Sequence, residues 1–106
     1  MSTYDLYGVH AASIDEAKAM LQQLLFCSFE EHDSEYHGGR YFRAGEERGE
    51  NFLLKRNLDA YEDVPAEEEF PTHALLFYVN GTERSISIQE VFRTTDAVEL
   101  LRHEDL

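Results

Sequence analysis

The sequence predicts a single α+β domain, residues 1–106, with a mainly antiparallel sheet and two helices. Short apolar segments with strand-like alternation recur along the chain, and one longer segment has helical spacing. A chain of 106 residues can also bury one core without disulfides or metal ions. With 42% hydrophobic residues, six glycines and two prolines, the composition excludes collagen-like and low-complexity classes.

The chain begins with a predicted strand and a predicted helix. Residues Tyr4–His10 alternate with a period of two, which indicates a strand with both faces partly covered. Ser13 and Glu16 have the spacing of a capping box, in which each side chain binds the other residue's backbone N–H. Apolar residues then recur three and four apart, so we expect a helix over Ser13–Leu25 with one apolar face.

Three further strands are expected in the first half. The segments Phe26–His32 and Tyr36–Ala44 predict the second and third strands, and a glycine pair in the latter indicates a bulge or a close backbone approach. The polar turn Gly45–Gly49, bracketed by glycines, precedes a fourth strand at Asn51–Lys55. The turn predicts that the third and fourth strands form a hairpin.

A long acidic loop divides the chain. The segment Asn57–Pro71 carries six acidic residues, two prolines and no basic residue, so we expect its charge to hold it in water. The apolar run His73–Val79 predicts a central strand that is closed by the turn pair Asn80–Gly81.

The C-terminal part completes the element order βαβββ-βαβ. Residues Ser85–Arg93 fit either an alternating strand or a short helix begun by Ser87, and the spacing of Ser87 and Glu90 favours the helix. The segment Ala97–His103 predicts the last strand.

Acidic residues dominate the charge. There are 22 acidic and nine basic residues, which give a net charge of −13 and exclude nucleic acid and anionic membranes as partners. We expect two solvent-facing acidic clusters, which serve either as a solubility surface or as a steering surface for a basic partner. Their residues are Glu30, Glu31, Asp33 and Glu35 in the first cluster and Asp59, Glu62, Asp63, Glu67, Glu68 and Glu69 in the second.

A segment rich in aromatic and donor side chains, Ser34–Arg43, follows the first cluster. Tyr and Arg are common at binding hot spots because they combine a large contact area with a polar tip. The predicted contacts to a partner are made by Tyr36, Arg40 and Tyr41, together with Tyr61 from the acidic loop. The alternative is that these are ordinary sheet residues, with Arg40 and Arg43 paired to Glu50 or Glu47.

No sequence motif indicates catalysis or a cofactor. Cys27 follows an apolar helix end and is predicted to be a small core or boundary residue. The five histidines lack metal-ligand spacing on a helix, and the phosphate-loop and EF-hand patterns are absent. One cysteine excludes an internal disulfide, and the sequence contains neither signal-peptide nor membrane-span features. We therefore expect a cytoplasmic protein without a cofactor.

The βαβββ start, with its helix at Ser13–Leu25 and its hairpin around Gly45–Gly49, resembles one module of the glyoxalase and bleomycin-resistance superfamily. An incomplete second module would begin at His73. The resemblance implies a metal site made of His10, Glu50 and His73. The alternative function that it implies is a metal-dependent enzyme or a small-molecule binder.

In size, acidity and its contact-like segment the chain also resembles the immunity proteins of bacterial toxin systems, including contact-dependent growth inhibition. Those proteins neutralise a cognate, often basic, nuclease toxin by covering its active site or substrate-binding surface. The resemblance implies a non-enzymatic inhibitor whose carboxylates mimic the phosphates that a nuclease binds. A subunit that associates with its own copy is a third possibility, and the sequence leaves the oligomeric state open.

Overall fold

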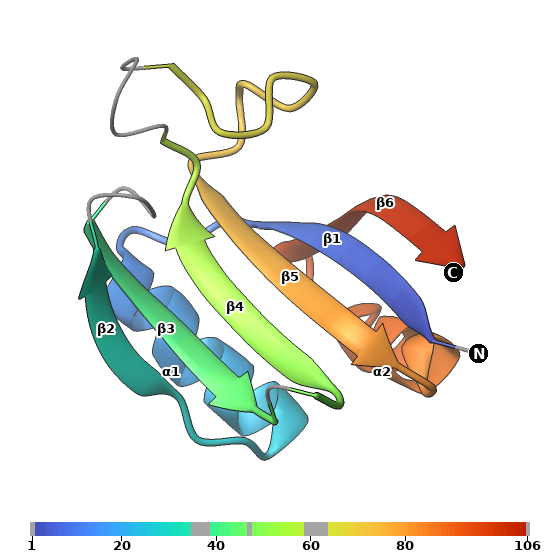
Figure 1. The fold of residues 1–106 in the computed structure, drawn as a ribbon. Helices are drawn as coiled ribbons and strands as arrows, with labels where there is room; N and C mark the ends of the chain where they lie inside the picture. The colour runs from blue at the N-terminus through green and yellow to red at the C-terminus, as the bar shows by residue number, and fades with distance from the viewer. Residues whose placement is uncertain (1, 35–38, 47, 59–63, 106) are drawn as a thin grey trace.

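A computed structural model describes residues 2–34, 39–46, 48–58 and 64–105. They form a six-stranded antiparallel sheet with the strand order β2-β3-β4-β5-β1-β6, and Figure 1 shows both helices on the same face of that sheet. The predicted class and element order are confirmed. The elements are β1 (Thr3–Val9), α1 (Ile14–Leu25), β2 (Glu30–Ser34), β3 (Gly39–Gly45), β4 (Asn51–Arg56), β5 (Leu75–Thr82), α2 (Ser85–Phe92) and β6 (Val98–Asp105).

The C-terminal strands are built into the same sheet as the N-terminal ones. Strand β5 lies between β4 and β1, and β6 extends the sheet beyond β1. The segment from His73 onward therefore forms no separate partial module, and the expected division into two modules is wrong. The cause lies in the apolar run that begins β5, because Leu75, Leu76 and Phe77 are all buried and a strand buried on both faces takes a central position.

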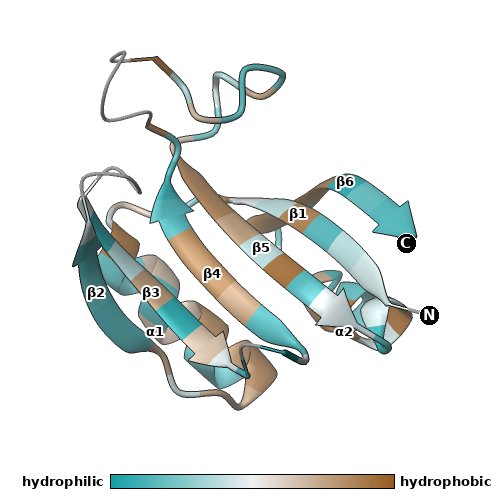
Figure 2. Cartoon of the chain, viewed as in Figure 1, coloured by the Kyte–Doolittle hydropathy of each residue, from teal (hydrophilic) through white to brown (hydrophobic). Residues whose placement is uncertain are grey.

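The main core lies between the sheet and the two helices. Leu21 of α1 and Ile88 of α2 pack in one cluster with Tyr7 and Phe77 from the central strands. Figure 2 shows apolar residues along β4 and β5, whereas the edge strand β2 is polar. Within the part of the chain that the structure describes, neither helix is long and apolar enough to cross a membrane.

Helix α1 begins as the sequence predicts. The Glu16 backbone N–H donates to Ser13 Oγ at 3.1 Å. The Glu16 carboxylate accepts from the Ala12 N–H at 3.2 Å, one residue earlier than the expected Ser13 N–H. Helix α2 confirms the helical alternative for its segment but begins at Ser85, so the predicted start at Ser87 is wrong.

Two predicted strand boundaries are also wrong. Strand β2 begins at Glu30 because Phe26 ends α1 in a left-handed conformation with φ of 53° and the Phe29 N–H donates to Gln22. Strand β5 runs through Asn80 and Gly81 instead of turning there. It carries one extra residue relative to β1 at this point, a bulge that Gly81 accommodates with φ of +64°.

Polar connections gather at one end of the sheet, at the top of Figure 1. Here β1, β2 and β4 end and β3, β5 and β6 begin, as the register pairs Ser34 with Gly39 and Val9 with both Leu75 and Val98 show. We call this the loop end. The described parts of the acidic loop are residues 57–58 and 64–71, and residues 64–73 lead into β5 at the same end.

The described part of the acidic loop is tied to the sheet. The Asn57 side chain donates to the carbonyl oxygens of Phe70 and His73 and accepts from the Glu67 N–H. The Glu67 carboxylate accepts from Tyr78 at 2.6 Å and from Arg102 at 3.3 Å. The expectation of a loop held in water by its charge is therefore wrong for this part, because one carboxylate is turned inward onto the sheet.

Candidate functional site

The first acidic cluster lies on the edge strand β2, where Glu30, Glu31 and Asp33 are exposed as predicted. Strand alternation places Glu31 and Asp33 on the helix side of the sheet and Glu30 on the opposite side. Glu35 and Tyr36 lie outside the described residues. The described members of this cluster therefore present negative charge on both sides of one edge.

Arg40 is held by carboxylates of this chain. Its Nη2 lies 2.7 Å from both Asp15 and Glu31, so it pairs with those residues and not with Glu50 as the sheet-residue alternative expected. The hydrogen bond from Arg40 holds the pKa of Asp15 below its ordinary value. Tyr41 lies on the opposite face of the sheet and stacks on His32, with ring centroids 5.4 Å apart.

The second acidic cluster is only partly available to a partner. Glu68 and Glu69 are exposed, whereas Glu67 is engaged by Tyr78 and Arg102. Burial raises the pKa of Glu67. These two hydrogen bonds, together with the nearby positive charges, outweigh burial and lower the pKa. The other predicted members lie outside the described residues; they are Asp59, Tyr61, Glu62 and Asp63.

Internal ion pairs leave the surface charge strongly negative. Arg84 binds Glu50 through two nitrogens, at 2.6 and 2.9 Å, and Arg102 binds Glu67. Together with Arg40, three of the nine basic residues are therefore neutralised by carboxylates of the chain itself. Asp33 lies near the loop end, where β2 ends, and Glu68 and Glu69 precede β5 at the same end, whereas Glu30 begins β2 at its opposite end.

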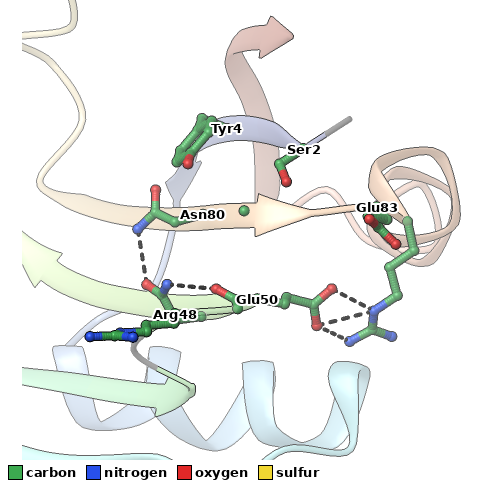
Figure 3. A pocket seen from close by; sticks show the side chains of 10 residues that line it. Ser2, Tyr4, Arg48, Glu50, Asn80 and Glu83 are labelled. Carbon is green, nitrogen blue, oxygen red and sulfur yellow. Dashed lines mark hydrogen bonds and ion pairs between the residues drawn. The ribbon is translucent and has the colours of Figure 1, made fainter. Parts of the chain in front are cut away.

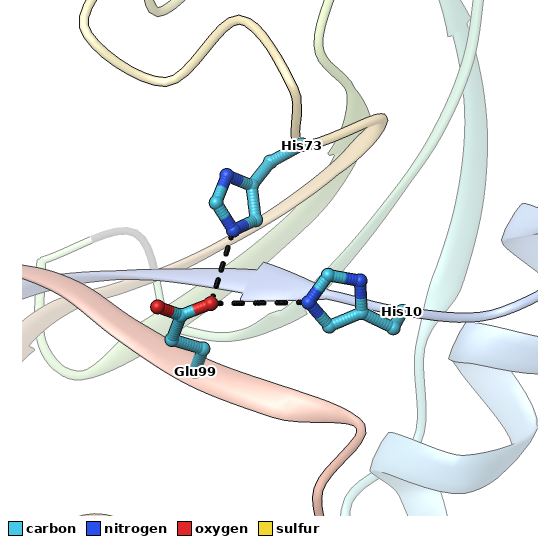
Figure 4. Close-up of side chains that lie close together, drawn as sticks. All are labelled: His10, His73 and Glu99. Atoms are coloured by element: carbon cyan, nitrogen blue, oxygen red, sulfur yellow. Dashed lines mark hydrogen bonds and ion pairs between the residues drawn. The ribbon is translucent and has the colours of Figure 1, made fainter.

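Two histidines and a glutamate meet at the same end of the sheet (Figure 4). His10 follows β1, His73 precedes β5 and Glu99 is the second residue of β6. The Nε2 atoms of His73 and His10 lie 3.1 and 3.8 Å from the same oxygen of Glu99. The hydrogen bond from His73 holds the pKa of Glu99 below its ordinary value.

Glu50 does not belong to this cluster, contrary to what the glyoxalase resemblance implied. It precedes β4 and binds Arg84 and Thr82, beyond the far end of β5 from His73. A strand of eight residues separates the two positions by roughly 25 Å. The structure thus confirms the proximity of His10 and His73 but supplies Glu99 as their acidic neighbour.

A second histidine–carboxylate cluster lies towards the opposite end of β1. The buried Asp5 carboxylate accepts a hydrogen bond from Ser85 Oγ at 2.5 Å and another from His103 Nδ1. These hydrogen bonds join β1 to α2 and β6. No sequence signal identified the cluster, although an aspartate inside an otherwise apolar strand is a residue that needs buried donors.

The Asp5 cluster contains the residue types of a hydrolase triad without its connectivity. In a triad the histidine lies between the acid and the serine, and its second nitrogen takes the serine proton. Here Ser85 donates directly to Asp5 and accepts from Gln89 at 3.0 Å. The nitrogen of His103 nearest to Ser85 is the one that faces Asp5, so this arrangement holds the fold together and does not activate Ser85.

A hollow of about 1010 Å³ lies beside the end of β5 (Figure 3). Its lining is polar and includes Tyr4, Arg48 and Asn80. Its carboxylate from Glu50 is already bound to Arg84. Because apolar walls with a few convergent polar groups are typical of small-molecule sites, this hollow is a poor candidate for one.

Cys27, the only cysteine of the chain, is partly buried against the edge of the core. Burial raises the pKa of its thiol, which disfavours the reactive thiolate. The prediction of a core or boundary residue is confirmed.

The chain matches no protein-family model and no curated protein sequence. The functional conclusion therefore rests on the residues and their geometry.

Proposed function

We propose that this protein is a non-enzymatic immunity protein of the cytoplasm, which binds and neutralises a basic toxin domain. The observation that carries the proposal is that exposed members of both acidic clusters lie toward the loop end. Asp33 on β2 and the pair Glu68–Glu69 are far apart in the sequence, yet their segments reach the same end of the sheet.

Such a surface suits a partner that binds phosphate groups. Carboxylates form short charge-assisted hydrogen bonds with Lys and Arg, the residues that a nuclease presents to its substrate. A net charge of −13 adds long-range attraction, which accelerates encounter with a basic protein and weakens as salt is added. The stacked pair His32–Tyr41 supplies flat contact area on the face of β2 that carries Glu30, and such contacts depend less on salt.

The internal arginine pairs support the same function. Arg40 binds Asp15 and Glu31 and thereby fixes part of the edge around β2 before any partner arrives. Preorganised groups lose less conformational entropy on binding than mobile ones do. A rigid acidic surface can therefore bind tightly without a disorder-to-order step.

The test uses the tagged protein to capture its partner from a lysate of the source organism, followed by mass spectrometry and measurement of association kinetics. We expect one basic protein in stoichiometric amount, whose toxicity is relieved when the two proteins are co-expressed. Association should slow about tenfold between low and physiological salt.

Two charge-neutralised variants locate the interface. Glu68→Gln with Glu69→Gln removes exposed charge at the loop end, and we expect it to slow association with the captured protein more than it speeds dissociation. The matched control, Glu83→Gln with Glu90→Gln, removes the same charge at exposed positions beside and within α2. Equal loss in both variants would contradict a localised interface, and capture of an acidic partner or of none would contradict the proposal.

A further inference from the structure

We propose that His10, His73 and Glu99 form a binding site for one divalent transition-metal ion of the Zn²⁺ type. The inference goes beyond the proposed immunity function and does not depend on it. Two imidazoles and one carboxylate are a ligand set that zinc uses in sites that keep a fourth position open for water. In Figure 4 both imidazoles point toward the same carboxylate oxygen.

The spacing of the three donor atoms fits one ion after a small adjustment. Tetrahedral Zn²⁺ with bonds of about 2.0–2.1 Å places its ligand atoms about 3.3 Å apart. The distances from Glu99 to His73 and His10 are 3.1 and 3.8 Å, and all three donor atoms lie within 4.8 Å of one another. The His10 side chain is 58% exposed, so it can turn toward the other two ligands without disturbing the core.

His73 is held in place by its surroundings. Its ring occupies the space above Gly8, where a Cβ atom would overlap ring atom Cδ2. Phe70 packs edge-on against the ring, with centroids 6.3 Å apart, and Asn57 donates to the His73 carbonyl oxygen. The ring is therefore positioned before a ligand arrives, which lowers the entropic cost of binding.

Glu99 and His10 are positioned by the sheet itself. Gly8 pairs in register with Glu99 of β6, and the His10 N–H donates to the Ala97 carbonyl oxygen at 2.7 Å. Neighbouring strands thus bring residues 10, 73 and 99 to the loop end from three separate parts of the chain. Nδ1 of His73 is buried and has no hydrogen-bond partner among the described residues. Metal binding at Nε2 would place the ring proton on Nδ1, where no described residue accepts it, so the site relies on the packing of the His73 ring and not on a second hydrogen bond to orient it.

The ligand chemistry favours borderline transition metals over calcium and magnesium. Imidazole nitrogen suits Zn²⁺, Ni²⁺ and Cu²⁺, whereas Ca²⁺ and Mg²⁺ require oxygen ligands. The bound ion would carry two positive charges against one carboxylate, and the strongly acidic chain around it would attract it.

The test is isothermal titration of the metal-free protein with ZnCl₂. We expect one ion per chain in the wild type. The variants His10→Asn and Glu99→Gln each remove one exposed ligand without opening the core, and each should weaken binding at least about tenfold, the usual loss when a metal site is damaged. Mg²⁺ should not compete at a tenfold excess over Zn²⁺.

Matched controls separate this site from general attraction of cations to an acidic surface. His32→Asn changes a histidine on β2, and Glu90→Gln changes an exposed carboxylate on α2, both outside the cluster. Both controls should keep wild-type affinity. Equal affinity in all five proteins, or no binding at about 0.1 mM Zn²⁺, would overturn the proposal. Neither result would bear on capture of a basic partner, so the two proposals fail separately.

Discussion

Two histidine–carboxylate clusters join β1 to β6. In one, β1 supplies the carboxylate and β6 the histidine; in the other, the histidine follows β1 and β6 supplies the carboxylate. Asp5 on β1 binds His103 on β6, whereas His10 after β1 faces Glu99 on β6. The first carboxylate is fully buried, and the second side chain is 58% exposed. A carboxylate–imidazole pair thus occurs in two different environments.

The environments decide what each cluster can do. Around Asp5, Ser85 and His103 supply donors, and the Asp5 side chain is fully buried, so this carboxylate is closed to any further ligand. Around Glu99, two imidazoles converge on one oxygen at the surface, which leaves room for an ion. A buried acid with all its donors stabilises the fold, and an exposed acid between two histidines can bind a ligand.

The largest expected effect is the loss of the buried acid. Asp5→Asn removes the charge that binds Ser85 and His103, and its amide NH₂ group then faces one of these two donors. We expect the free energy of unfolding to fall by about 3 kcal/mol. Urea denaturation measures this change.

The control for Asp5 is the other carboxylate near the same histidine. Asp105 lies 3.4 Å from His103 Nε2, and its side chain is 66% exposed. Asp105→Asn should change the free energy of unfolding by less than about 0.5 kcal/mol, because exposed ion pairs contribute little. Similar losses in both variants would show that burial is not what distinguishes the two acids.

The second prediction concerns the position of His73 in the open cluster. In Gly8→Ala the new methyl group overlaps the His73 ring, which must move. We expect a loss of about 1–3 kcal/mol in stability and weaker Zn²⁺ binding in the same variant. Gly49→Ala is the matched control, since the nearest atoms to its Cβ are 3.6 Å away in the flexible Glu46 side chain. Unchanged zinc affinity in Gly8→Ala would contradict the positioning of His73 by Gly8.

The third prediction concerns Glu67, a carboxylate of intermediate burial that also contacts β6. Glu67→Gln weakens the hydrogen bonds from Tyr78 and Arg102 that tie residues 64–73 to the sheet. We expect the free energy of unfolding to fall by about 1–2 kcal/mol and amide exchange in this segment to accelerate. The neighbouring variant Glu68→Gln should leave both quantities unchanged, because its side chain is exposed.

The smallest expected effect is a pH dependence of stability at His103. The hydrogen bond to Asp5 raises the pKa of His103 above its ordinary value of 6.5, although burial opposes the shift. A pKa that is raised in the folded state adds to the free energy of unfolding. This contribution is fully present below pH 6.5 and is lost as the pH rises through the folded-state pKa. Urea denaturation between pH 5.5 and pH 9 should show the decline, and His103→Gln should remove it. An unchanged slope in that variant would assign the decline to other groups.

Local patterns predicted the elements, and long-range pairing determined the clusters. The Ser13–Glu16 spacing and the apolar stripe after it predicted α1, and the glycine-bracketed turn predicted the hairpin of β3 and β4. Asp5 and His103 are 98 positions apart, and no local pattern pairs them. The acidic neighbour of His10 is Glu99 because β1 pairs with β6, which the element order does not reveal.

The acidic loop shows the same limit. Its composition correctly indicated a segment without regular strands in its described part, but the inward turn of Glu67 depends on Tyr78 and Arg102 in distant strands. Charge counting treats every carboxylate alike, whereas the sheet offers donors to only some of them.

The most direct measurement is a Zn²⁺ titration monitored by NMR. The signals of the histidine ring nitrogens and of the protons on the adjacent ring carbons report on both clusters in one sample. We expect the ring signals of His10 and His73 to shift together and saturate at one ion per chain, while those of His103 stay in place. Equal shifts of His103, or no shift of His10 and His73, would contradict the distinction between an open and a closed cluster.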